Sequence, residues 1–159
     1  MDDCQKYLDS GIKELNQGNA DKAIEDITKA IEIKKDWEIP YFYRAVAHHS
    51  LEEFDEAIID YTKAIEINEK MTDAYYNRAK ITLSRKDIKN PNINQAITDL
   101  EKALQQDNKF LDALYAMAAA HKKLGNYQKA LEYLDKLIEI EPDAVNARAF
   151  KKLLLQKYL

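Results

Sequence analysis

Residues 23–33 read AIEDITKAIEI, and residues 57–67 read AIIDYTKAIEI. The two segments are identical at nine of eleven positions and lie 34 residues apart. Weaker copies begin at Ala96 and Ala130, so the first alanines of successive copies are 34, 39 and 34 residues apart. Apolar residues within each copy recur at the three- and four-residue spacing of an amphipathic helix. Such self-similarity at a nearly fixed period is typical of a chain built from stacked helical repeats.

Turn and capping residues separate the helical segments. Gly18 and Gly125 each fall between the two helices of a repeat, where a chain reversal is needed. Pro91 fits the start of a second helix, because the first turn of a helix tolerates a missing amide hydrogen. Asp2 followed by Gln5 fits a capping box for the first helix. These signals favour short helices joined by tight turns.

The chain resembles the tetratricopeptide repeat family, in which a helix hairpin recurs every 34 residues. The resemblance covers nearly the whole chain, with repeats at residues 4–37, 38–71, 72–110 and 111–144 and a capping helix at about 145–158. Numbered from the start of each repeat, position 8 must be small because two helices cross there, and it holds Gly11, Ala45, Ala79 and Ala118. The resemblance implies a single all-α domain over residues 1–159, a right-handed superhelix of helix hairpins.

Two segments depart from the regular repeat. The third repeat carries five extra residues within residues 84–94. We expect these residues to lengthen a surface loop, with contact to a partner as the alternative. In the capping helix we expect Leu153, Leu154 and Leu155 to pack inward and the basic side chains to face water.

Composition and charge limit the classes of function. Charged residues make up 33% of the chain and hydrophobic residues 46%, and the net charge is −4 with both signs interspersed. No clustered basic face is present, so we expect neither nucleic-acid binding nor a role at a membrane surface. Cys4 is the only cysteine, which excludes an internal disulfide and a thiolate metal cluster. Without a signal peptide or a membrane-spanning apolar run, the expected location is the cytoplasm.

The resemblance implies a concave groove lined mostly by the first helix of each repeat. At the groove positions of the family, the candidates for contact with a partner are Leu8, Ile12, Phe42, Val46, His49, Tyr76, Lys80, Tyr115 and Lys122. Aromatic and aliphatic side chains dominate this set, and such side chains carry most of the binding energy at protein interfaces. We therefore predict a scaffold or adaptor that binds an apolar or amphipathic peptide segment of a protein partner.

Other uses of the same surface remain open. A homodimer or a segment absent from this sequence could cover the apolar side chains, or they could form an exposed and weakly used surface. The chain could also be a self-assembling structural module or the regulatory fragment of a larger complex. No Gly-rich phosphate loop, nucleophile elbow or zinc-protease motif is present, so we expect no enzyme, no catalytic residues and no cofactor.

The histidines and the cysteine are weighed separately because they could carry chemistry. His48 and His49 are neighbours, and adjacent helical residues point about 100° apart, so they do not easily share a metal ion. His48 and His121 occupy position 11, a packing site between helices in the family, so we expect packing and no metal site. Cys4 begins the first helix, whose dipole can lower a thiol pKa, but no histidine adjoins it and we expect no reactive role.

Charged residues also recur with the repeat. Arg44 and Arg78 occupy position 7, and Asp26, Asp60 and Asp99 occupy position 23 of their repeats. This spacing predicts partly buried ion pairs between hairpins, with contact to a ligand as the alternative.

Chaperone tails should not bind in this groove. Chaperone-binding members of the family hold a C-terminal carboxylate with Lys, Asn and Arg at fixed groove positions, where this chain has Leu8, Ile12, Tyr43, Asp73 and Asn77. Moving the register by one repeat retains only Asn77. A carboxylate without Lys or Arg partners is poorly held, so a chaperone tail peptide should show no binding by fluorescence anisotropy. An affinity that tracks the free carboxylate would contradict this prediction.

Overall fold

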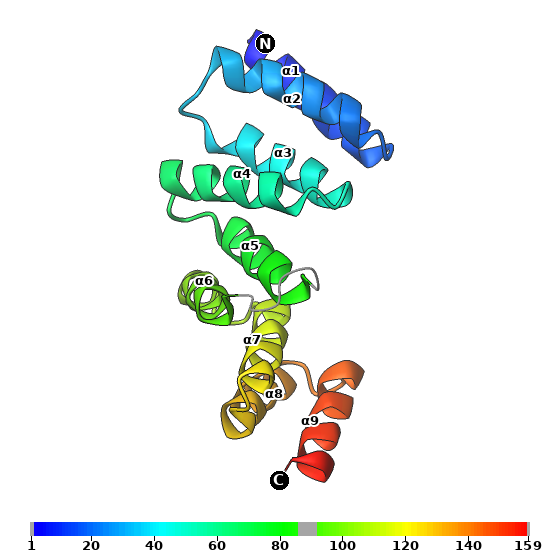
Figure 1. The fold of residues 1–159 in the computed structure, drawn as a ribbon, viewed down its shortest axis with the longest axis vertical. Coiled ribbons are helices and arrows are strands. Elements are labelled where there is room, and N and C mark those ends of the chain that lie inside the picture. Colours follow the sequence, from blue (N-terminus) through cyan, green and yellow to red (C-terminus); the bar gives the residue numbers. More distant parts are fainter. Residues whose placement is uncertain (1, 86–91, 159) are drawn as a thin grey trace. The chain divides into compact units, whose positions relative to one another are not determined.

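The computed structural model describes residues 2–85 and 92–158, and every regular element in these ranges is an α-helix (Figure 1). The helices are α1 (Asp3–Asn16), α2 (Ala20–Ile33), α3 (Glu38–Ser50), α4 (Phe54–Ile67), α5 (Thr72–Ser84), α6 (Ile93–Gln106), α7 (Leu111–Lys123), α8 (Tyr127–Ile140) and α9 (Val145–Lys157). The predicted all-α class of helix hairpins is confirmed.

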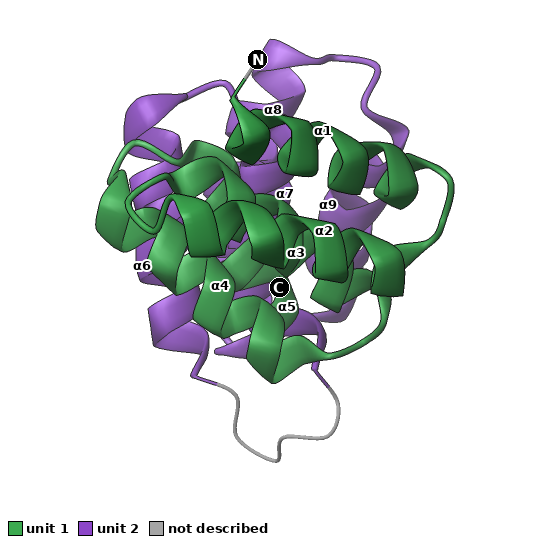
Figure 2. Cartoon of the chain, turned by 90° about the horizontal axis from the view of Figure 1, so that it is seen from above, with its two compact units in different colours: residues 1–81 green, residues 82–159 purple. Residues whose placement is uncertain are grey.

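The helices group into two compact units, residues 1–81 and residues 82–159 (Figure 2). In the first unit α1 packs on α2, α2 on α3, and α3 on α4. In the second unit α6 packs on α7, α7 on α8, and α8 on α9. The single domain over residues 1–159 stays a prediction, and each unit is described by itself.

The close approach of α1 and α2 explains the small residue at position 8. A Cβ atom at Gly11 would lie 2.4 Å from Cγ1 of Ile27 and 3.1 Å from the carbonyl oxygen of Ala23. Both neighbours are themselves buried, so neither has free space to move into. Ala45 and Ala118, at the same position of other repeats, are also fully buried. The sequence-based expectation that two helices cross here is confirmed for the first hairpin.

The turns inside the hairpins share one backbone conformation. Gly18, Glu52 and Gly125 occupy position 15 of their repeats and have φ angles of 81°, 61° and 75°. In all three turns, the residue after the one with positive φ donates its amide hydrogen to the carbonyl oxygen five residues earlier. In the first hairpin this bond joins Asn19 N to Glu14 O at 2.9 Å. A left-handed residue at this point suits glycine, so Glu52 carries a conformational cost that Gly18 and Gly125 do not.

The N-terminal cap of α1 differs in part from the sequence-based expectation. The Asp2 side chain accepts from the amide of Cys4 at 3.5 Å, as a cap should. Gln5 does not complete a capping box, because its side-chain amide donates to Asp9 Oδ1 at 2.8 Å. In α6, Asn92 is the cap and accepts from the amide of Gln95 at 3.1 Å. The helix start predicted at Pro91 lies outside the described residues, as does most of the inserted loop.

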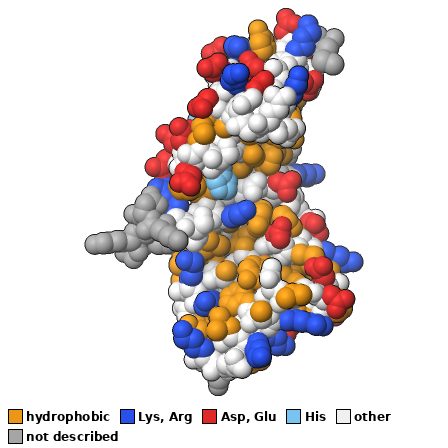
Figure 3. Space-filling view, turned by 90° about the vertical axis from the view of Figure 1, so that its right-hand side faces the viewer, with side chains coloured by type: hydrophobic (Ala, Val, Ile, Leu, Met, Phe, Trp, Pro, Cys, Tyr) orange, Lys and Arg blue, Asp and Glu red, His pale blue; other side chains and the backbone are white. Residues whose placement is uncertain are grey.

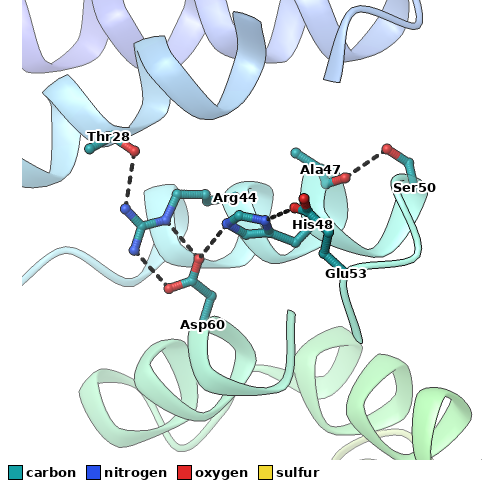
Figure 4. Close-up of polar contacts among 7 residues, drawn as sticks. All are labelled: Thr28, Arg44, Ala47, His48, Ser50, Glu53 and Asp60. Carbon is teal, nitrogen blue, oxygen red and sulfur yellow. Dashed lines mark hydrogen bonds and ion pairs between the residues drawn. The ribbon is translucent and has the colours of Figure 1, made fainter. Parts of the chain in front are cut away.

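Arg44 ties three helices together in the first unit (Figure 4). Its guanidinium donates to both carboxylate oxygens of Asp60 on α4, at 2.7 and 2.8 Å, and to Thr28 Oγ1 on α2 at 3.1 Å. Asp60 is only 4% exposed, and this bidentate hydrogen bond raises the pKa of Arg44. The predicted ion pair therefore exists, but within the α3–α4 hairpin, so the expectation that it joins two hairpins was wrong.

Polar contacts between hairpins instead join the side chain at position 7 of one repeat to the side chain at position 25 of the preceding repeat. Arg44 donates to Thr28 in this way, and Arg78 donates to Thr62 Oγ1 at 2.9 Å. In the second unit Lys151 of α9 pairs with Asp135 of α8, which are again 16 residues apart. In the first hairpin the shorter Ser10 occupies position 7 and donates only to Asp26 at 2.7 Å.

The packing of α9 corrects one expectation. Leu154 is buried, but Leu153 and Leu155 are 44% and 48% exposed. Successive helical residues point about 100° apart, so three consecutive leucines cannot all face one neighbouring helix. Lys152, at position 8 of this helix, is exposed where the repeats bury a small residue. The helix thus covers α8 on one side and presents basic and apolar side chains on its other sides.

Substitutions at the shared turn position should separate backbone strain from side-chain contacts. Nothing lies within 4 Å of a Cβ atom placed at Gly18, so Gly18→Ala should cost about 1–2 kcal/mol through its φ angle alone. Glu52→Gly should raise the free energy of unfolding by a similar or smaller amount. Glu52→Ala, which keeps the Cβ atom, is the control and should give no gain in chemical denaturation. Equal effects of the two Glu52 variants would show that the turn is unstrained.

Loss of Arg44 should strongly destabilise the first unit. Arg44→Ala leaves the Asp60 carboxylate buried without its main partner, which should cost about 3 kcal/mol in chemical denaturation. Ser10→Ala is the matched control at position 7, and about 1 kcal/mol or less is expected because Asp26 keeps its bond to Lys29. Replacing Arg44 and Asp60 together by apolar residues should recover much of the loss. Similar losses for Arg44→Ala and Ser10→Ala would refute a special role for the buried carboxylate.

Candidate binding surface

In the first unit, the predicted contact residues lie on α1, α3 and α5 and are mostly half-buried. Ile12 and Phe42 pack against the core of the first two hairpins with part of their surface still accessible. The ring of Phe42 lies 5.4 Å from that of Tyr43 and 5.7 Å from that of Tyr61. Val46 is also half-buried, one helical turn after Phe42. These contacts hold the Phe42 ring in a fixed orientation.

Leu8 does not belong to an accessible surface. Its side chain is 2% exposed and forms part of the core between α1 and α2. Burial of this kind contributes about 1.5–3 kcal/mol to stability and leaves no face for a partner. Leu8 is therefore a packing residue, and the proposal for the first unit rests on the remaining positions.

Polar candidates in the first unit lie close to aromatic rings. Lys80 Nζ is 6.0 Å from the ring centroid of Tyr76, and the ring of His49 is 5.9 Å from that of Phe54. Partial burial lowers the pKa of His49, and the positive charge of Lys80 lowers it further. This part of the surface therefore combines aromatic side chains with the ammonium group of Lys80.

In the second unit, α7 and α9 enclose an open groove of about 580 Å³. Two of the predicted contact residues, Tyr115 and Lys122, line it together. The described residues that line it are Tyr115, Ala119, Lys122, Lys123, Asn146, Ala149, Phe150 and Leu153. Figure 3 shows hydrophobic side chains gathered on this unit, with both basic and acidic side chains beside them. The volume falls within the range of pockets that hold small ligands or a few peptide side chains.

Aromatic contacts form the wall of this groove. The rings of Tyr115 and Phe150 are 5.5 Å apart and tilted by 53°. Lys122 Nζ lies 5.4 Å from the centroid of the Phe150 ring, so its ammonium group stands at the edge of the apolar surface. Tyr115 is 38% exposed, which leaves an apolar face available for contact. Ala119 and Ala149 also line the groove, and their short side chains fill little of its space.

The groove is basic although the chain is acidic overall. The part of its lining that the structure describes holds two lysines and no carboxylate, whereas the net charge of the chain is −4. Among the described residues, neither Lys122 nor Lys123 makes an ion pair. A second hollow, of about 660 Å³ and lined in part by α6 and α8, has two glutamates and two lysines in its lining. A third hollow, of about 420 Å³, shares Tyr115 and Asn146 with the groove and has Asp112, Glu141 and Asp143 in its lining. The basic side chains therefore lie at the end of the groove formed by the last turn of α7.

The contribution of α9 was missed in the sequence, because this helix was treated only as a cap. Asn146, Ala149 and Leu153 occupy positions 2, 5 and 9 when the repeat numbering continues from residue 145. These are three of the groove positions of the family. Continuing the numbering beyond the fourth repeat would have identified them.

The residues considered for chemistry have packing roles. The ring of His121 stacks on that of Tyr133 at 5.6 Å, and burial lowers the pKa of His121. Cys4 is buried, its thiol donates to the carbonyl oxygen of Ala30 at 3.3 Å, and burial raises the pKa of the thiol. Within residues 2–85 and 92–158, no group of three His, Cys, Asp or Glu side chains could hold a metal ion. In the same ranges, no helix is both long and apolar enough to span a bilayer.

Family models match three parts of the chain. Two tetratricopeptide repeat models match residues 14–36 and 39–71, and the model of the Fis1 C-terminal tetratricopeptide repeat matches residues 111–158. The last match contains α7, α8 and α9, and hence the whole groove. No curated protein matches the chain in sequence.

Solved structures share the fold at low sequence identity. MamA 41-end from Desulfovibrio magneticus RS-1 has a TM-score of 0.84 at 16% identity, covering 98% of this chain and 91% of that chain. PilF of Pseudomonas aeruginosa has a TM-score of 0.81 at 20% identity, with 97% and 68% covered.

A third structure contains a bound peptide. The first repeat domain of Spaghetti (RPAP3), bound to the HSP90 peptide SRMEEVD, has a TM-score of 0.70 at 23% identity, with 77% of this chain and 93% of that chain covered. At these identities the likeness concerns the fold alone. Together with the hairpin geometry and the three family matches, it shows that the chain is a tetratricopeptide repeat protein.

Proposed function

We propose that this protein is a non-enzymatic scaffold that binds an apolar or amphipathic peptide segment of a partner protein in the groove between α7 and α9. The observation that carries the proposal is an open, pre-formed groove with an aromatic wall, two alanines in its lining and two lysines that make no ion pair with a described residue. A pre-formed groove lowers the entropic cost of binding because its wall residues are already held in place.

The size of the groove sets the expected strength of binding. Tyr115 and Leu153 are both more than a third exposed, so a partner side chain can bury apolar surface against each. Each large apolar side chain that becomes buried contributes about 1.5–3 kcal/mol. Two such contacts sum to about 3–6 kcal/mol, less than the roughly 8 kcal/mol of micromolar affinity, so a short segment should bind weakly. This is the strength expected of an adaptor that exchanges partners.

The family relationship supports this type of function. Tetratricopeptide repeat proteins are typically protein-interaction scaffolds, and one structural neighbour was solved with a peptide bound. We place the adaptor in the cytoplasm, in keeping with a single cysteine that is a free thiol.

The surface of the first unit is proposed as a second contact region. Its candidates are Ile12, Phe42, Val46, His49, Tyr76 and Lys80. The alternative to a peptide partner on either surface is a second copy of this protein, which would form a homodimer.

Peptide display can test the groove with a matched pair of variants. Random peptides would be selected on the immobilised wild-type protein, and the enriched peptides would then be measured by fluorescence anisotropy. Leu153→Glu should weaken their binding by about tenfold or more, because a carboxylate replaces an apolar contact in the groove. Leu155→Glu is the control, since Leu155 is equally exposed on the same helix but does not line the groove.

Three results would count against the proposal. No enrichment of peptides, or equal loss of binding in both variants, would exclude the groove as the binding surface. A change in molar mass by light scattering that is specific to Leu153→Glu would identify the groove as a self-association surface instead. Circular dichroism melting would verify that both variants remain folded.

A further inference from the structure

We infer that the peptide segment bound in the α7–α9 groove carries an acidic side chain about two residues from its apolar anchor. This inference rests on the proposed function, because it specifies the partner of the same groove. The partner is a segment within a protein chain, recognised by its side chains and not by a free C-terminus.

Charge complementarity is the first reason. Of the eight described residues that line the groove, the charged ones are both lysines. In a protein with four more acidic than basic residues, this is a local reversal of sign. A basic segment would meet repulsion here, whereas a carboxylate would find two cations beside an apolar wall.

The second reason is that the lysines are available. Lys29, Lys63 and Lys151 each pair with a nearby carboxylate of the chain, but Lys122 and Lys123 have no such partner among the described residues. The ammonium group of Lys122 is placed over the Phe150 ring, at the border between the apolar wall and solvent. A carboxylate that binds there displaces no internal ion pair. Its hydrogen bonds with an ammonium group would be charge-assisted and hence stronger than neutral ones.

A structural role for the lysines explains less of the geometry. They lie in the last turn of α7, where positive charge interacts favourably with the helix dipole. That effect accounts for basic residues at the end of α7, but not for their place beside the exposed Tyr115–Phe150 wall. It also predicts a loss of stability on neutralising them, and no change in peptide preference.

The distance along α7 between the apolar lining and the lysines sets the spacing between the apolar anchor and the acidic side chain of the bound peptide. The apolar lining residue Ala119 lies three and four residues before Lys122 and Lys123, which is about 4.5–6 Å along a helix. An extended peptide advances about 3.3 Å per residue, so an acidic side chain two residues from the anchor would reach the lysines.

The test is a peptide library with both termini blocked, in which a fixed leucine or phenylalanine is followed and preceded by randomised positions. Selection on the wild-type protein should enrich Asp and Glu over Lys and Arg by about fivefold to tenfold at two residues from the anchor. The preference should vanish for Lys122→Gln/Lys123→Gln. It should persist for Lys129→Gln/Lys136→Gln, two lysines outside the groove lining.

The outcomes separate this inference from the function on which it rests. Enrichment of apolar anchors without any acidic preference would overturn the inference and leave peptide binding in place. An acidic preference that persists in Lys122→Gln/Lys123→Gln would overturn it as well. Binding that appears only with a free C-terminal carboxylate would assign the groove to chain ends, and this too would refute the inference. Failure to enrich any anchored peptide would refute both proposals.

Discussion

The close contact between the two helices of a hairpin is the constraint on which the rest of the structure depends. At Gly11 the backbone of α1 comes so near to Ile27 and Ala23 of α2 that a methyl group has no room. This short distance lets short helices, none of which would be stable alone, bury a shared apolar face. It also fixes which residues of each first helix turn away from its partner, and these are the residues left to form a contact surface.

Polar bonds add direction to this apolar packing. Arg44 on α3 binds Asp60 on α4 and Thr28 on α2. The contact to the preceding hairpin recurs as the Arg78–Thr62 hydrogen bond and as the Lys151–Asp135 ion pair. A buried ion pair contributes less net stability than its geometry suggests, because both groups lose water. Its effect is to make other alignments of the hairpins unfavourable, since a shifted helix would leave the Asp60 carboxylate buried without a partner.

The repeats in the sequence predicted most of the fold, but they did not predict which side chains line the candidate site. Helix class, hairpin turns and the small residue at position 8 could be predicted because each is a local rule repeated in the sequence. Leu8 was assigned to the surface by its position number, but burial depends on the size of the neighbours, which numbering does not include. The groove contribution of Phe150 and Leu153 was missed because a terminal helix packs on one side only. The charge of the groove depends on which side chains share it across two helices, which the linear sequence does not state.

The exposed Lys152 on α9 affects whether a further helix can pack on this end of the stack of hairpins. An open stack of identical contact faces is a template for end-to-end polymerisation, as in any assembly whose interface does not close on itself. Another helix could pack on α9 in the usual way only by excluding water from a lysine at the point of closest approach. One charged side chain, at a position where the four repeats hold glycine or alanine, thus makes the usual packing of a further helix costly on this face of α9.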